Sequence, residues 1–353
     1  MTTNQSKTFR IFVSSTFSDL KVERNALQER VFPRLRKLCA QHGVRFQAID
    51  LRWGVSEEAA LDQQTMNICL AEIERCQLVS PRPNFVLLLG DRYGWMPPPP
   101  QIPVEDFTAI LGKIDNMEDR TLLHKWYWRD DNAVPPEYCL QPREGEMALY
   151  EHWEPVERRL QQVLENAALK LDLWPDELIK YTASATEQEI VDGAMRVADA
   201  RDHVFCFFRE IEGLPEDIRA KGFVDLDAEG RWDSEAKNKL QDLKSRLAEY
   251  MPENIHPYPT RWQEDGITLD HLEQLCNDVY KRLSRVILDE LSLIDEVDPL
   301  EAEIQAHATF GVERARFFAG RAGYLRRIGE YLEGTSTQPM AIWGESGSGK
   351  SAL

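Results

Sequence analysis

The first hundred residues alternate between two patterns of apolar positions. Strand-like runs occur at 9–13, 44–51 and 84–90, and the last is continuously apolar, as in a parallel sheet that is covered on both faces. Between these runs, segments 20–39 and 66–76 place apolar residues on one helical face. This alternation of strand and helix predicts a doubly wound α/β domain with a parallel sheet.

The alternation stops at the four consecutive prolines of 97–100, which have a fixed φ and no backbone donor. An acidic, tryptophan-rich stretch follows, so we expect a mostly helical insertion at about 95–180. A capped helix at 184–198 and a strand at 203–208 then resume the α/β pattern. The first domain is therefore predicted to span 1–210.

Two further segments are predicted beyond residue 210. The stretch 211–304 is polar and is expected to be a helical linker region. The last segment, 305–353, is expected to begin an NTPase domain and to contain a strand at 340–343, with sequence MAIW. The helices expected within these two segments lie near 235–250, 268–292, 299–317 and 321–333.

Composition and charge narrow the possible partners and the cellular compartment. The chain is 42% hydrophobic and 29% charged, which is ordinary for a globular protein. The formal net charge is −18; residues 1–50 carry +5 and the remainder −23, so we expect neither a nucleic acid nor a membrane as partner. Six cysteines without a CxxC pair, and a start without signal-peptide features, indicate reduced thiols in the cytoplasm.

A phosphate-binding motif lies near the end of the chain. The octapeptide GESGSGKS fits G-x-x-x-x-G-K-[ST] at every fixed position. Gly344, Gly347 and Gly349 would let backbone N–H groups surround the β-phosphate, and Lys350 would reach the β and γ oxygens. Ser351 would hold Mg²⁺. The motif therefore predicts ATP with Mg²⁺ as the cofactor.

Only two residues follow Ser351. Phosphoryl transfer also needs a second carboxylate for the metal ion and a positioned water molecule. We therefore expect the chain to be the N-terminal part of a longer NTPase, interrupted in its P-loop, and not to hydrolyse ATP by itself.

Polar and aromatic side chains follow each of the first three predicted strands, at the edge where ligands bind in open parallel sheets. One interpretation is a nucleotide or sugar site. The other is a structural edge, with ion pairs Asp50–Arg52 and Asp91–Arg92 and with tryptophans that cap the core. The residues are Ser14, Ser15 and Thr16; Asp50, Arg52 and Trp53; and Asp91, Arg92, Tyr93 and Trp95.

Several of these segments resemble a known family. FRIFVSSTFSDLKVERNAL, AIDLRWGVSEEAA, ICLAEIERC, FVLLLGDRYGW and SATEQEI occur in the order found in the domain-of-unknown-function 4062 family, which precedes large NTPase domains. The segment before the P-loop, with FAGR at 318–321, resembles the lead-in to NACHT/STAND ATPases. The resemblance covers about 1–100, 180–210 and 305–353.

The resemblance implies a TIR-like domain with a small flavodoxin-like parallel sheet. Such domains act through assembly or cleave NAD⁺. In TIR enzymes a glutamate on a late helix holds the nicotinamide riboside, which makes Glu189 the candidate catalytic residue and Glu187 the reserve. Glu187 could instead complete a capping box with Ser184. The substrate of such an enzyme would be NAD⁺.

The expected protein is thus the N-terminal effector or adaptor portion of a STAND-type signalling NTPase, in bacterial immune or stress signalling. It would form a homo-oligomer through its NTPase domain and act on an unidentified downstream protein after an unidentified trigger. An interaction module and an oligomerisation-activated NAD⁺-cleaving enzyme both remain open.

Overall fold

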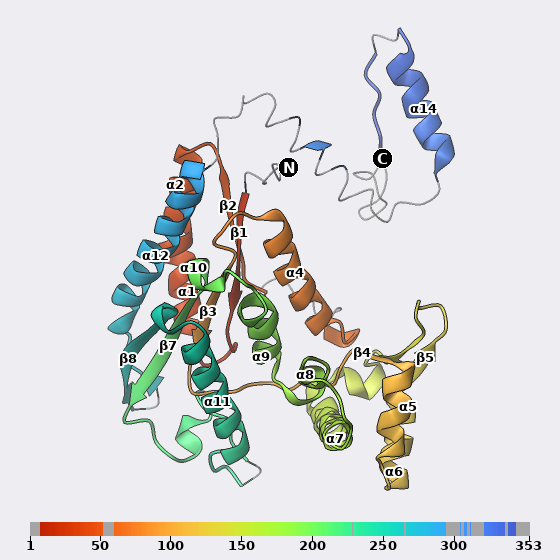
Figure 1. Ribbon diagram of the computed structural model, residues 1–353, viewed down its shortest axis with the longest axis vertical. Coiled ribbons are helices and arrows are strands. Elements are labelled where there is room, and N and C mark those ends of the chain that lie inside the picture. The colour runs from red at the N-terminus through yellow and green to blue at the C-terminus, as the bar shows by residue number, and fades with distance from the viewer. Residues whose placement is uncertain are drawn as a thin grey trace. The chain divides into compact units, whose positions relative to one another are not determined.

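The structure is a computed structural model that describes residues 8–51, 60–227, 229–264, 266–293, 304, 307–308, 311, 321–335 and 338–343 (Figure 1). The chain divides into two units. One comprises Thr8–Leu291, and the other comprises Met1–Lys7 with Ser292–Leu353. Each unit is described by itself below.

A six-stranded sheet forms the centre of the larger unit, in the order β2-β1-β3-β7-β8-β9. All neighbouring strands are parallel except β8 and β9. The first five strands have the flavodoxin-like order 2-1-3-4-5, which confirms the predicted fold class. The strands are β1 (Thr8–Ser14), β2 (Arg45–Ile49), β3 (Phe85–Leu89), β7 (Phe205–Glu212), β8 (Ile255–Gln263) and β9 (Gly266–Ile267).

Helices cover both faces of this sheet. Successive residues of a strand point to opposite faces, so each strand contributes side chains to the core on both sides. On β1, Ile11 packs with residues of α2 and α12, whereas Phe12 packs with residues of α4, α9 and α11. The bounds are α1 (Lys21–Ala26), a π-helical turn (Leu27–Val31), α2 (Phe32–Gln41), α4 (Thr65–Val79), α9 (Ala185–Ile190) with a second π-helical turn (Val191–Met195), α10 (Ala200–His203), α11 (Ser234–Tyr250) and α12 (His271–Leu293).

The α/β fold continues past residue 210, the boundary predicted from the sequence. Strand β8 pairs with β7 over seven residues, from Ile255 to Arg261. Helix α12 buries Val279 and Leu283 in the same core as β1. The stretch expected to be a linker therefore supplies a strand, a covering helix and part of the hydrophobic core.

The insertion between β3 and α9 combines helices with a small antiparallel sheet, of order β4-β6-β5, that the sequence analysis did not predict. Its own core includes Phe107, Trp126 and Trp153. Trp128 and Trp174 are exposed. The elements are β4 (Gln101–Pro103), α5 (Val104–Gly112), α6 (Met117–Trp126), β5 (Tyr127–Asp130), β6 (Glu137–Leu140), α7 (Tyr150–Ala168) and α8 (Pro175–Thr182).

The smaller unit contains α14 (Ala322–Glu333), where a helix was predicted. Residues 340–343, predicted to be a strand, have no regular structure, because no described residue pairs with them and the Trp343 side chain is exposed. The P-loop at 344–351 and residues 318–320 of FAGR lie outside the described residues, as does most of 299–317. None of the described helices is long and apolar enough to cross a bilayer.

Candidate functional site

The order of strands places the candidate site at the carboxyl ends of β1 and β3. Chain connections leave in opposite directions at this point, so the loops after the two strands separate and open an edge. Ser14 ends β1, and Asp91 follows β3 closely. The side chains predicted for the ligand edge therefore lie on neighbouring strands.

The structure brings Glu189 to the end of β1. Ser184 caps the N-terminus of α9, with its Oγ accepting from the Glu187 N–H at 3.2 Å. One turn further on, the Ser14 hydroxyl donates to Glu189 Oε2 at 2.6 Å, and the Cys69 thiol also hydrogen-bonds to this carboxyl. These two hydrogen bonds join residues that are far apart in the sequence.

Glu189 is buried, with 6% of its surface exposed. Burial raises the pKa of its carboxyl from 4.5 to about 7, because the charged form loses its hydration. The hydrogen bonds from Ser14 and Cys69 and the positive charge of Arg24 offset part of this rise. The group therefore changes its charge near neutral pH.

Arg24 is a second centre of this edge that sequence reasoning missed. Its guanidinium pairs with the Asp50 carboxylate and donates to Ser15 Oγ at 2.7 Å. The side chains of Arg24 and Asp50 are both buried. Asp50 was expected to pair with Arg52, but Arg52 and Trp53 lie outside the described residues. Ser15 and Asp50 are thus held by an arginine from α1.

A third group of charges lies beneath the same edge. Arg209 is fully buried. Its guanidinium donates to Asp19 Oδ2 at 2.9 Å and to Glu23 Oε1 at 3.1 Å. His271 Nε2 lies 3.1 Å from the same Glu23 oxygen. Gly90 allows this packing, since a Cβ there would lie 2.4 Å from Asp19 Oδ2. These contacts join β7 to the loop after β1 and to α1, and they join α12 to α1.

Glu187 is also held in a buried contact. Its carboxylate accepts from the Tyr93 hydroxyl and pairs with Arg246 of α11. Only half of the expected capping box forms, because the Ser184 N–H donates to the Tyr93 hydroxyl at 3.1 Å and not to Glu187. Burial, and then the nearby charge of Glu187, raise the pKa of Tyr93.

The expected ion pair Asp91–Arg92 does not form. Arg92 Nε lies 3.0 Å from an Asp225 oxygen, and Asp91 lies 3.9 Å from Lys244 Nζ. Neighbouring residues of an extended segment point away from each other, so each finds a partner elsewhere. The charged residues of the edge are therefore paired, but Asp91 and Arg92 have partners from distant segments and not each other.

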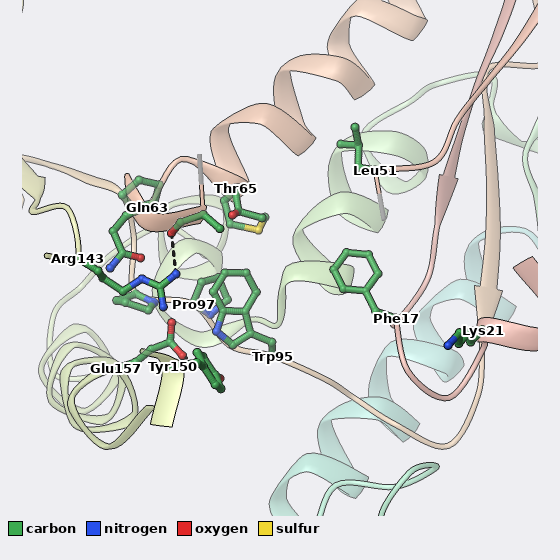
Figure 2. Close-up of a pocket in the computed structure, with 14 residues that line it drawn as sticks. Phe17, Lys21, Leu51, Gln63, Thr65, Trp95, Pro97, Arg143, Tyr150 and Glu157 are labelled. Carbon is green, nitrogen blue, oxygen red and sulfur yellow. Dashed lines mark hydrogen bonds between the residues drawn. The ribbon is translucent and has the colours of Figure 1, made fainter. Parts of the chain in front are cut away.

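One pocket of about 530 Å³ opens beside this edge, in the larger unit. Of the candidate residues that the structure describes, only Trp95 lines it; Ser14, Glu187 and Glu189 do not. Figure 2 shows Gln63, Arg143, Tyr150 and Glu157 towards one side and Phe17, Leu51 and Lys21 towards the other. The remaining lining residues are Ala60, Thr65, Met66, Pro97, Pro98 and Pro100.

Glu157 is the buried carboxyl of this pocket. Trp153 Nε1 donates to it at 2.9 Å and the Tyr150 hydroxyl at 3.4 Å, and Trp95 also hydrogen-bonds to it. Burial raises the pKa of Glu157, and these hydrogen bonds together with the Arg143 charge act against the rise. Within the part of the chain that the structure describes, no three His, Cys, Asp or Glu residues are grouped so as to hold a metal ion.

The segment that forms most of the candidate edge matches a known protein family. Residues 10–105 match the family model described as "Domain of unknown function (DUF4062)". The chain contains a DUF4062 domain. The match covers most of β1 and all of β2, α4 and β3. It includes Ser14, Ser15, Asp50, Asp91, Arg92 and Tyr93 of the candidate edge.

Relatives extend the similarity beyond the DUF4062 domain. The chain is 30% identical to mouse NACHT domain- and WD repeat-containing protein 1 over 95% of its own length, and 31% identical to the human protein of that name over 92%. It spans 22% of the length of each. Over 28% of the chain, it is 40% identical to mouse telomerase protein component 1, of which it covers 4%. No solved structure gave a significant match.

Proposed function

We propose that this chain is the N-terminal portion of a NACHT-type signalling NTPase, and that its α/β domain is a non-catalytic adaptor. The P-loop motif follows the α/β domain in chain order, and relatives at 30% and 31% identity are named for a NACHT domain. In the complete protein, ATP with Mg²⁺ would bind Lys350 and Ser351, and nucleotide-driven homo-oligomerisation would gather the α/β domains around a downstream protein.

One observation supports the adaptor role. The polar side chains at the carboxyl edge bind one another: Glu189 with Ser14, Glu187 with Tyr93 and Arg246. A catalytic carboxylate must reach its substrate, whereas Glu189 is 6% exposed and does not line the pocket. Closed networks of this kind hold the loops of an edge in one shape, which suits recognition of a protein partner.

A second candidate function is the cleavage of NAD⁺, and the Glu189 carboxyl favours it. Its pKa of about 7 and its 2.6 Å contact with the Ser14 hydroxyl are properties of a tuned catalytic acid. In this alternative Glu189 would stabilise an oxocarbenium-like state at the ribose, as glycosidase carboxylates do. Glu187 is the weaker choice, because its charge is already paired with Arg246.

The test fuses residues 1–353 to a protein that assembles into a defined oligomer, and follows NAD⁺ by chromatography. We expect NAD⁺ to stay intact in the folded, clustered protein. Consumption of NAD⁺ that stops on Glu189→Gln would overturn the adaptor assignment and establish the enzyme. Glu74→Gln, at an exposed position of α4, is the matched control.

The NTPase part of the proposal is tested separately in the longer protein. Lys350→Ala should abolish ATP binding and ATP-dependent assembly, because the lysine neutralises the β and γ phosphates. Assembly that persists in the variant would contradict the proposal. The expected role in bacterial immune or stress signalling stays a prediction, since the relatives named above are mouse and human proteins whose names give no such role.

A further inference from the structure

The pocket beside the carboxyl edge contains two buried hydrogen-bond donors without a partner. Gln63 Nε2 and Arg143 Nε are both buried, and neither atom has a hydrogen bond in the structure. Both residues line the same pocket. Buried donors are nearly always paired, because an unpaired one has given up its water without replacement. Two in one cavity indicate a place for an acceptor.

Both residues make hydrogen bonds to the segment that precedes α4. Arg143 Nη2 donates to the Ala60 carbonyl at 3.1 Å, and its backbone N–H donates to the Leu61 carbonyl at 2.8 Å. Gln63 has a left-handed backbone, with φ of 59°, and its N–H donates to the Ala60 carbonyl at 3.3 Å. The donors come from different regions of the chain, and neither needs to be ordered by a ligand.

The other walls of the pocket are mostly apolar. Phe17, Trp95 and Tyr150 present aromatic side chains, and proline rings lie alongside Trp95 in the sequence. Glu157 already accepts hydrogen bonds from Trp153 and Tyr150, so the pocket offers little to a ligand that only donates. A volume of about 530 Å³ lies in the range of small-molecule sites, roughly 300–1,000 Å³.

We propose that this pocket binds a small aromatic carboxylate. The carboxylate oxygens would accept from Gln63 Nε2 and Arg143 Nε, and the ring would pack against Trp95 and the neighbouring prolines. The positive charge of Arg143 favours an anion over a neutral ring. The site depends neither on cleavage of NAD⁺ nor on ATP, so it goes beyond the proposed adaptor function and can fail independently of it.

The probe is 2-naphthoate, titrated into the 353-residue protein by isothermal calorimetry. The comparison ligand is 2-naphthylmethanol, which keeps the ring but lacks the carboxylate. We expect saturable binding of 2-naphthoate, at least tenfold tighter than that of the alcohol, because the anion gains charge-assisted hydrogen bonds.

Gln63→Glu is the decisive variant. It keeps the shape of the side chain but replaces the N–H donor by a carboxylate oxygen that repels the probe. We expect the Kd for 2-naphthoate to rise at least tenfold, and the Kd for the alcohol to change little. Gln162→Glu makes the same change at an exposed position of α7 and should leave both affinities unchanged.

A second variant keeps the test decisive if the first fails to fold. Arg143→Lys retains the positive charge but removes the Nε donor, and it should also weaken 2-naphthoate binding tenfold or more. Circular dichroism checks the fold of each variant. The proposal is overturned if 2-naphthoate shows no saturable binding, if both ligands bind equally, or if the folded variants bind the probe as the natural sequence does.

Discussion

The substitution Glu189→Gln should stabilise the fold, and by an amount that depends on pH. Glutamine has the shape of the protonated glutamate but no charge to desolvate. A glutamate carboxyl ordinarily has a pKa of 4.5, and that of Glu189 in the folded chain is about 7. Each pH unit of that difference is worth about 1.4 kcal/mol, so the ionised carboxylate costs the folded state about 3 kcal/mol above pH 7.

The direction in which the free energy of unfolding changes with pH follows from proton binding. Between pH 4.5 and 7 the unfolded chain releases the Glu189 proton while the folded chain keeps it. The free energy of unfolding therefore falls as pH rises through this window and levels off above it. Below pH 4.5 both states are protonated, and this group contributes no difference.

Urea denaturation followed by tryptophan fluorescence measures the effect. The free energy of unfolding of Glu189→Gln minus that of the natural sequence should rise by about 2 kcal/mol from pH 5.5 to pH 8. Other groups titrate alike in both proteins and cancel. Glu74→Gln, at an exposed position, should show no such slope. A pH-independent difference, or a Glu189→Gln protein that is less stable at pH 8, would refute this reasoning.

Two further predictions concern the fold. Arg209→Leu should lower the free energy of unfolding at pH 7 by about 3–5 kcal/mol, measured by urea denaturation, because Asp19 and Glu23 stay buried without their positively charged partner; a loss under 1 kcal/mol would contradict it. Residues 1–293 should give a cooperative thermal transition by circular dichroism, whereas 1–210 should not, because the shorter chain lacks β8 and α12. A cooperative transition of the shorter chain would show that these elements are dispensable.

The central strands were predictable because their continuous apolar sequences indicate burial on both faces of the sheet. Residues 84–90 form a continuous apolar run, and β3 lies within it with all five residues buried. Strand β8 was missed because Pro257 and Pro259 suggest a turn. In the structure, Tyr258 and Thr260 between and after these prolines are buried, so the strand has an alternating pattern that the prolines obscured.

The candidate site was predictable only in part. Ser14 was chosen because it follows a predicted strand, and Glu189 because of the family resemblance; the structure joins the two by a hydrogen bond. The ion-pair partners could not be predicted, because each depends on tertiary packing: Arg24 reaches Asp50 from α1. Nothing in the sequence marked Gln63 or Arg143, whose importance lies in donors that remain unpaired after folding.

Helix α9 is buried along nearly its whole length, from Thr186 to Ile190. Arg246 of α11 holds Glu187 on one side, and the Ala185 N–H donates to the Trp95 carbonyl at 2.8 Å on another. Because only 6% of its surface is exposed, a molecule can reach the Glu189 carboxyl only after the packing around α9 has opened. Any chemistry at Glu189 would then begin with a first-order opening step, and at high substrate concentration its rate could not exceed that of the opening.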